Sequence, residues 1–424
     1  MEYKIVNARL LYKESFLEGE ILIKDGKTHR VSKNIQENLP KIDAEGKLLL
    51  PGLIDPHAHL RDSLLSYKED FDTGTSAALA GGYTLLLDMP NTKPQIDSPE
   101  RIKKRIEEAK GKINCDVGFY SLAFPNSDFS SLFKAGAIAI KIYLHKRFRD
   151  EEWSYENLRK VMKELSKFKR VLAFHAEELD PPFELDKYDV FLHSSFHDER
   201  AEIRAVKKII DLAKDYDLPI HFCHISTPQA LEEIYYTKLK GLNLTLELTP
   251  HHLLLDDSYF KLGNIALVEP PLRALEDVME LRKALYEGKV DMIGSDHAPH
   301  TIDEKLEEKP LPGFPNLEIS FSLLNTLTDK FDVINLIKLM SINVARRFGL
   351  KKVGAIEEGY KANLFLFDPK EEWRIDPLRF LSKAKYSPFQ GFLVRGKVKK
   401  TLLRGNIVYE DGVILKRGLG EVII

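Results

Sequence analysis

The sequence predicts an α/β fold, a (β/α)8 barrel, and two observations carry that prediction. Eight short apolar runs recur along the middle of the chain, at 53–59, 83–90, 116–123, 137–144, 170–177, 219–226, 244–251 and 290–300. Helical patterns separate most of these runs, and continuous apolar strands that alternate with helices are typical of parallel strands covered on both faces. Eight such units in roughly 300 residues match the usual size of the barrel, with a doubly wound open sheet as the alternative.

The segments between the runs carry helix start and stop signals. Residues 98–112 begin with Ser-Pro-Glu and reach a glycine near their end, and 198–216 and 227–241 have similar patterns. A capping residue, an early proline or acid and a closing glycine mark the two ends of a helix. These three segments are therefore predicted to be helices that cover the barrel.

The two ends of the chain differ from its middle. Residues 1–50 and 351–424 contain short apolar strands separated by turn residues, with no helical pattern between them. Each end is too short to fold easily alone. We expect the two to pair into one small β domain beside a catalytic barrel of residues 51–350.

Composition and charge exclude several classes of protein. The chain has 424 residues, 43% of them hydrophobic, and a formal net charge of −2. It has no basic stripe interleaved with aromatic residues, which argues against a nucleic-acid partner. It also lacks an apolar run of about 18 residues and a long apolar signal core, which argues against a membrane span and export. Two cysteines, Cys115 and Cys223, form no disulfide framework and suit the cytoplasm.

Polar residues gather at the carboxyl ends of the predicted strands, where barrel enzymes carry their sites. His57 and His59 are two positions apart, so strand alternation places both rings on one face, suited to gripping a metal ion. The other strand-end residues of this kind are His175, His224 and Asp296. Imidazoles with a carboxylate suit zinc best. His297 follows Asp296 directly and is expected to point to the opposite face.

Lys141 lies inside the apolar run "AIAIKIYL". A buried ammonium is costly, and either its stem reaches outward to solvent or a carboxylate, or burial favours the neutral amine. A neutral amine can take up carbon dioxide and become a carbamate, whose two oxygens suit a bridge between two metal ions. Next to so many histidines, we favour the carbamate.

Eight motifs in order give the chain a family resemblance. They are "PGLIDPHAHLR", "GGYTLLLDMPNTKP", "IKIYL", "FHAEE", "CHIST", "ELTPHHLLL", "GSDHAPHT" and "PGFPNLE". Together they resemble the amidohydrolase superfamily and, within it, the class I dihydroorotases, over nearly the whole chain. The resemblance implies a barrel with a small β-sandwich from both termini. It also implies a zinc-dependent, reversible cyclisation of N-carbamoyl-L-aspartate to L-dihydroorotate in pyrimidine biosynthesis.

By position, the resemblance implies two zinc ions per subunit. His57, His59 and Asp296 would hold the more buried ion, His175 and His224 the second, and a carboxylated Lys141 would bridge them. Asp296 would also be catalytic, as the group that moves the proton. The implied substrate-binding residues are Arg61, Asn91 and His300, which match a group that holds the substrate carboxylate, and the backbone of Pro312 and Gly313.

Some alternatives stay open. An allantoinase or a dihydropyrimidinase would keep the same metal centre, and a homodimer or a complex with other pyrimidine enzymes is compatible with the sequence. The chain reads "VEPPLR" where bacterial class I members commonly have Asn-Pro-Pro-Leu-Arg, so Glu269 departs from the pattern. Cys223, Glu247 and His252 either complete a third metal site with His175 or support the ligands by hydrogen bonds, and we favour the second. The charged part of 301–320 is expected to be a solvated loop.

Overall fold

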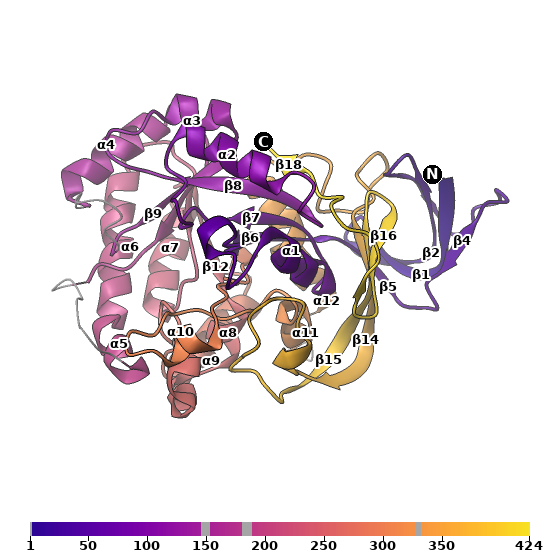
Figure 1. The fold of residues 1–424 in the computed structure, drawn as a ribbon. Coiled ribbons are helices and arrows are strands. Elements are labelled where there is room, and N and C mark those ends of the chain that lie inside the picture. Colours follow the sequence, from indigo (N-terminus) through magenta and orange to yellow (C-terminus); the bar gives the residue numbers. More distant parts are fainter. Residues whose placement is uncertain (1, 146–152, 180–188, 328–331) are drawn as a thin grey trace.

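The computed structural model describes residues 2–145, 153–179, 189–327 and 332–424. Its larger part is a barrel whose parallel strands neighbour one another in chain order (Figure 1). The strands are β6 (Leu53–Ala58), β7 (Tyr83–Asp88), β8 (Asp116–Leu122), β9 (Ala137–Tyr143), β10 (Leu172–His175), β11 (Ile220–Phe222), β12 (Leu244–Leu248) and β13 (Met292–Ile293). A parallel bridge between Ala58 and His297 joins the last strand region to the first. The predicted barrel is confirmed, and the open sheet is wrong.

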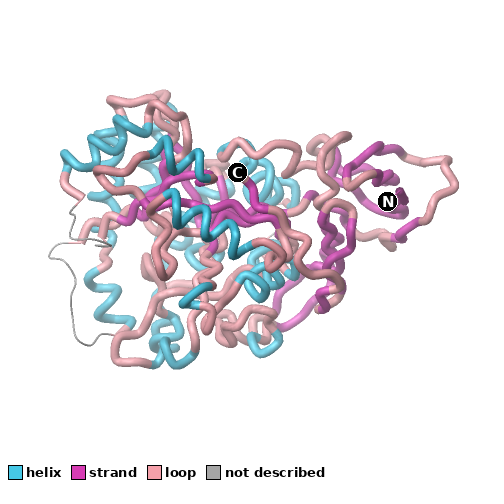
Figure 2. The backbone as a smooth tube through the Cα atoms, turned by 45° about the horizontal axis from the view of Figure 1, so that its top comes forward, coloured by secondary structure: helices cyan, strands magenta, loops and turns pink. Residues whose placement is uncertain are grey.

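Helices follow most of the strands and surround the barrel (Figures 1 and 2). The longer ones are α1 (Phe71–Ala80), α2 (Pro99–Ala109), α3 (Phe129–Ala135), α4 (Tyr155–Leu165), α6 (Glu199–Ala213), α7 (Pro228–Leu239) and α9 (Leu275–Tyr286). Ser98 caps α2 and Thr227 caps α7 by accepting a backbone N–H in the first turn, with proline at the start of each helix. The three helices predicted from sequence are therefore present.

The remaining helical segments lie in the connections between these elements. They are η1 (Ser63–Leu65), α5 (Val190–Phe196), α8 (Pro250–Leu254), η2 (Asp257–Ala266), α10 (Ile302–Leu306), α11 (Ser320–Asn325), α12 (Val333–Ile337), η3 (Lys338–Ile342), α13 (Asn343–Arg347) and η4 (Pro377–Arg379). None of the helices within the described ranges combines the length and apolar character that a membrane crossing requires.

The strands are buried on both faces, and alternation decides which side chains enter the barrel. Leu172 and Phe174 of β10 pack with the surrounding helices in the largest apolar cluster. Ala173, between them, packs instead in an inner cluster with Ala139 of β9 and Cys223. Side chains two positions further along a strand share the same face. The pattern therefore directs Lys141 and His175 into the barrel.

The two ends of the chain form a second, nine-stranded sheet. Its strands are β1 (Glu2–Tyr12), β2 (Ser15–Lys24), β3 (Lys27–Ser32), β4 (Lys41–Asp43), β5 (Leu48–Pro51), β14 (Leu364–Arg374), β15 (Leu393–Leu403), β16 (Asn406–Glu410) and β17 (Val413–Ile414). Antiparallel pairing of β5 with β14 joins the two ends, with Leu49 opposite Leu366. The predicted β domain built from both ends is confirmed.

The small sheet is one continuous surface that folds over on itself. The Tyr3 hydroxyl on β1 donates to the Gly405 carbonyl between β15 and β16, at 2.6 Å, although neither of those strands neighbours β1. Ile5 and Ile21, which pair on β1 and β2, meet Leu402 of the distant β15 in one apolar cluster. The expected sandwich is therefore made by folding a single sheet.

The last strand, β18 (Val422–Ile423), leaves this sheet and pairs with β8 of the barrel. Asp116, at the start of β8, anchors the same segment: it accepts a hydrogen bond from the Glu421 backbone and pairs with Arg404 at 2.7 Å. The end of the chain thus holds the amino-terminal end of a barrel strand, away from the polar strand ends described next.

Candidate active site

The predicted site residues meet in one pocket at the carboxyl ends of the barrel strands. Nine of them line it: His57, His59, Arg61, Asn91, His175, His224, Asp296, Pro312 and Gly313. Lys141 lies below the pocket and is fully buried, and His300 lies beside it against Arg61. The residues that were selected from sequence therefore lie close together in the folded protein. The function of each stays a prediction.

His57, His59 and Asp296 form the first half of a metal-binding arrangement. The Nε2 atoms of the two rings lie 3.4 and 3.3 Å from the same oxygen of Asp296. The opposite nitrogens are held in place, because His57 Nδ1 donates to Glu247 at 2.6 Å and His59 Nδ1 donates to Asn91 at 2.7 Å. Rings fixed through one nitrogen while the other faces a common point are typical of metal ligands.

The electrostatics of this group favour a cation. Burial and Lys141 lower the pKa of His57, but Cys223, Glu247 and Asp296 outweigh them and raise it to about 10. Burial is the main reason that the pKa of Asp296 is raised to about 6. In the protein without metal, a proton on His57 balances these buried acids. A bound metal ion supplies the same positive charge, so the donor set fits a metal.

His175 and His224 form the second half. Their rings lie 4.4 Å apart, and the ring of His224 lies 5.1 Å from that of His57, which connects the two halves. His224 Nδ1 is buried without a hydrogen-bond partner among the residues that the structure describes. A buried ring nitrogen without a hydrogen-bond partner costs free energy of folding. A role of this ring as a metal ligand would explain why it is placed here.

The side chain of Lys141 extends into the barrel interior next to these histidines. Its Nζ lies 2.7 Å from the Cys223 Sγ, and it points toward the face of Tyr143, 5.0 Å from the ring centroid. Tyr143 lines the pocket itself. Alternation along β9 places Lys141 and Tyr143 on the same face, so this tyrosine could have been found from sequence by the reasoning that selected the lysine.

Strained backbone accompanies the polar groups. Arg61, His224 and Asp296 all have positive φ, at 54, 34 and 44°. Non-glycine residues in this region cost free energy, and such residues cluster at functional sites. Each of the three ends or follows a strand, and the left-handed turn redirects its side chain.

Arg61, one of the predicted substrate residues, is held by its neighbours at the pocket. Its Nη2 lies 3.3 Å from His300 Nε2, and its Nε donates to the Pro299 carbonyl at 3.4 Å. Gly313 lines the same pocket with φ of 144°, and a Cβ there would lie 2.4 Å from the Ala298 carbonyl oxygen. Only glycine fits this backbone, which explains the residue without a contribution from the substrate.

The structure separates the three residues considered for a third metal site. Glu247 and Cys223 lie within ligand distance of His57. His252 lies elsewhere, with its ring held between the Thr249 hydroxyl at 2.9 Å and the Pro270 carbonyl at 3.1 Å. His252 belongs to none of the candidate metal-binding groups among the described residues, and the favoured interpretation, that these residues support the ligands by hydrogen bonds, stays a prediction. His297, as expected, points away and approaches Glu69, at 3.4 Å.

The prediction of a solvated loop for the charged part of 301–320 is wrong for α10 and for the buried Glu304 and Lys305, whereas Asp303 and residues 307–309 are exposed. Residues Ile302–Leu306 form α10, capped by Thr301. Lys305 is fully buried and donates to three backbone carbonyls, those of Leu267, Leu311 and Gly313. The charge pattern suggested exposure, but the carbonyls satisfy the ammonium inside the protein.

Besides Tyr143, sequence reasoning missed Glu269 at the pocket and His145 beside it. Glu269, which was noted only as a departure from the family pattern, lines the pocket and pairs with His145. His145 follows β9 closely, and no periodic pattern marks it. Its ring lies 4.2 Å from the ring of His175.

Comparisons with known proteins agree with this geometry. A family model described as the amidohydrolase family matches residues 48–408. The chain is 36% identical to a dihydroorotase of Pyrococcus horikoshii over 99% of this chain and 95% of that one. It is 36% identical to a dihydroorotase of Clostridium botulinum over 97% and 100%. Among solved structures, the L-hydantoinase of Arthrobacter aurescens superposes with a TM-score of 0.93 at 25% identity, covering 100% of this chain and 99% of that one.

Proposed function

The chain belongs to the amidohydrolase family, and we propose that it is a dihydroorotase. It is an enzyme that acts on a small molecule, a cyclic amide, and contains a metal cofactor. The proposed reaction is the reversible cyclisation of N-carbamoyl-L-aspartate to L-dihydroorotate in the pyrimidine pathway of the cytoplasm. The observation that carries the proposal is Arg61, a buried cation in the same pocket as the metal-ligating cluster.

We propose two zinc ions as the cofactor. His57, His59 and Asp296 would hold one, His175 and His224 the other, and a carboxylated Lys141 would lie between them. The support is the convergence of ring nitrogens on Asp296 and the uncompensated nitrogen of His224. When bound, such ions lower the pKa of a water molecule to about 7 and polarise the amide carbonyl.

The chain's own residues supply the rest of the chemistry. Asp296 accepts a proton at its carboxylate from the attacking water and delivers it to the ring nitrogen that leaves. Without metal, burial raises the pKa of this carboxyl group to about 6. In the biosynthetic direction, the same carboxylate takes the proton from the carbamoyl nitrogen. Glu247 holds the His57 ring in position throughout, through Nδ1.

Arg61 orients the substrate. Dihydroorotate carries a carboxylate on its ring, and a guanidinium binds such a group with two charge-assisted hydrogen bonds. Asn91, His300 and the backbone of Pro312 and Gly313 complete the proposed binding site. Fixing the ring in this way also fixes the distance between the amide carbon and the attacking oxygen, which contributes to the rate.

A hydantoinase or dihydropyrimidinase is the second candidate, because the L-hydantoinase has the same fold over its whole length. The ring amides hydrolysed by such enzymes need not carry a carboxylate. A buried Arg61 without a carboxylate to bind would be costly in that case. The arginine therefore favours dihydroorotate over the neutral rings, and over allantoin.

Substrate profiling tests the proposal. The zinc-loaded protein is assayed for hydrolysis of L-dihydroorotate, dihydrouracil, hydantoin and allantoin under one set of conditions. We expect kcat/KM for dihydroorotate to exceed the others by roughly 10- to 150-fold, the size of one charge-assisted contact. A higher value for hydantoin or dihydrouracil would overturn the assignment. In Arg61→Met the preference for dihydroorotate should shrink toward that for the neutral rings.

A further inference from the structure

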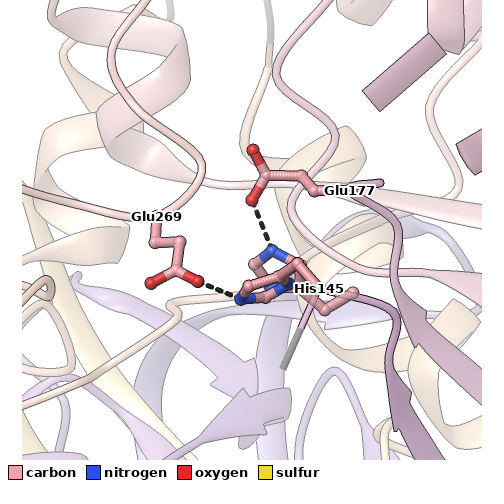
Figure 3. Close-up of side chains that lie close together, drawn as sticks. His145, Glu177 and Glu269 are labelled. Carbon is pink, nitrogen blue, oxygen red and sulfur yellow. Dashed lines mark hydrogen bonds and ion pairs between the residues drawn. The ribbon is translucent and has the colours of Figure 1, made fainter. Parts of the chain in front are cut away.

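Beside the proposed zinc centre lies a second group of metal-ligating side chains that the reaction does not use. It consists of His145, Glu177 and Glu269, with His175 on its border. In Figure 3, Glu177 and Glu269 point toward His145 from two sides. One ligand atom of each of the four residues lies within 4.8 Å of the others. We call His145, Glu177 and Glu269 the rim cluster.

The rim cluster is buried, unlike the acidic groups that are common on protein surfaces. The side chains of His145, Glu177 and Glu269 are 4, 0 and 9% exposed. Buried carboxylates need compensation by cations or hydrogen bonds. Glu177 Oε2 has it, since it accepts from His175 at 2.5 Å and from His197 at 3.1 Å.

Glu177 Oε1 is different. It is buried and has no hydrogen-bond partner among the residues that the structure describes. An unpaired oxygen on a fully buried carboxylate costs free energy, and nearby imidazoles do not satisfy it. In Figure 3 the Glu177 oxygen that faces the rings is the paired Oε2, and a cation bound on that side would compensate the charge of the buried carboxylate as a whole.

The spacing is close to that of a metal site. Ligand atoms at about 2.0–2.2 Å from a tetrahedral ion lie roughly 3.3–3.6 Å from one another. The ligand atoms lie within 4.8 Å of one another, so binding would draw any pair closer by at most about 1.5 Å. Two carboxylates with one or two imidazoles suit zinc and related divalent ions such as manganese.

The rim cluster also joins three separate segments. His145 follows β9, Glu177 follows β10, and Glu269 lies in the loop between η2 and α9. Glu269 lines the pocket, so an ion here would fix the position of one pocket wall. None of its three residues belongs to the proposed zinc centre, although Glu177 contacts one ligand of that centre, His175, at 2.5 Å.

We propose that His145, Glu177 and Glu269 hold an additional divalent metal ion, of the zinc class, which ties these three segments together at the rim of the pocket. The ion is separate from those of the proposed zinc centre. Its presence does not depend on which cyclic amide the enzyme hydrolyses.

Anomalous scattering locates such an ion directly. Crystals of the whole protein grown with zinc are measured on both sides of the zinc absorption edge. We expect a peak between His145 Nε2 and the two carboxylates, in addition to any peak at His57 and His224. Zinc-replete crystals without a peak at the rim cluster would overturn the proposal, whatever they contain elsewhere.

Metal content gives a second readout in solution. Glu269→Gln should bind one equivalent of zinc fewer than the unchanged protein, and its anomalous map should lack only the rim peak. The matched control is Glu280→Gln, because Glu280 is exposed on α9 and pairs only with Lys283 in the described structure. An unchanged zinc content in Glu269→Gln would contradict the proposal, and dihydroorotate turnover plays no part in either measurement.

Discussion

Lys141 Nζ lies 2.7 Å from Cys223 Sγ, and both side chains are buried in the barrel. Within the described part of the chain, no carboxylate lies at ion-pair distance from this ammonium. A buried lysine without a carboxylate is unusual. Lys305 shows the alternative solution, since three backbone carbonyls surround it. Backbone carbonyls compensate the ammonium of Lys305 but not that of Lys141. The burial of Lys141 therefore needs another explanation.

We expect Lys141 to carry a carbamate when metal is bound. Protein reconstituted with zinc and ¹³C-bicarbonate should show a carbamate carbon signal by NMR, because the neutral amine adds carbon dioxide. Lys141→Met should lack the signal and most of the activity. A signal that survives in this variant, or its absence in the active protein, would contradict the assignment.

Asp296→Asn removes the proposed proton carrier while keeping its shape. We expect kcat to fall by about 10²–10⁴, the usual contribution of a general acid–base group. Zinc content, measured on the same sample, should stay close to that of the unchanged protein. Asp291→Asn is the control, since Asp291 lies near β13 but pairs with Lys238 outside the pocket. Full turnover in Asp296→Asn would exclude the assigned role.

Arg61→Met tests substrate orientation. Loss of charge-assisted hydrogen bonds worth about 1.5–3 kcal/mol should raise KM for dihydroorotate roughly 10- to 150-fold. Hydrolysis of dihydrouracil, which has no carboxylate, should change little. If both substrates lose activity equally, Arg61 supports the pocket rather than the carboxylate.

His252 should make the protein sensitive to acid. Burial, the main cause, lowers its pKa from 6.5 to about 4. The folded state therefore holds the ring neutral while the unfolded state becomes charged, so this stability is complete above about pH 6.5 and is lost as pH falls toward 4. The shift corresponds to roughly 3 kcal/mol.

Urea unfolding between pH 7 and 4.5 measures this effect. His252→Gln should be less stable at pH 7, because it disturbs the contacts to Thr249 and Pro270, but its midpoint should fall less with pH than that of the unchanged protein. His29→Gln on the exposed part of β3 should follow the unchanged protein. Parallel pH curves for all three would show that His252 is not responsible.

The fold could be predicted from sequence because its signal is local. A buried parallel strand must be apolar throughout, and the run containing Lys141 is interrupted by that one residue. Two-residue alternation then indicated which side chains share a face. The proximity of His57 and His59 to Asp296 followed from the rule that strand ends meet at one edge of a barrel.

The remaining features depend on contacts between distant loops, which alternation does not reach. Glu269 and His145 lie in separate loops, and only the folded chain shows that they pair. Lys305 appeared exposed because charge patterns do not reveal backbone carbonyls folded over a side chain. His252 shares a motif with His251 but turns toward Pro270, away from the metal ligands.

The joining of β5 to β14 has a consequence for how the protein is made. Residues 1–50 leave the ribosome long before the strands that complete their sheet. The hydroxyl of Tyr3 donates a hydrogen bond to a carbonyl 402 positions later in the sequence. Contacts this remote are slow to form. Until β14 has been synthesised, β5 presents an unpaired edge, and an unpaired strand edge of this kind exposes a nascent chain to aggregation.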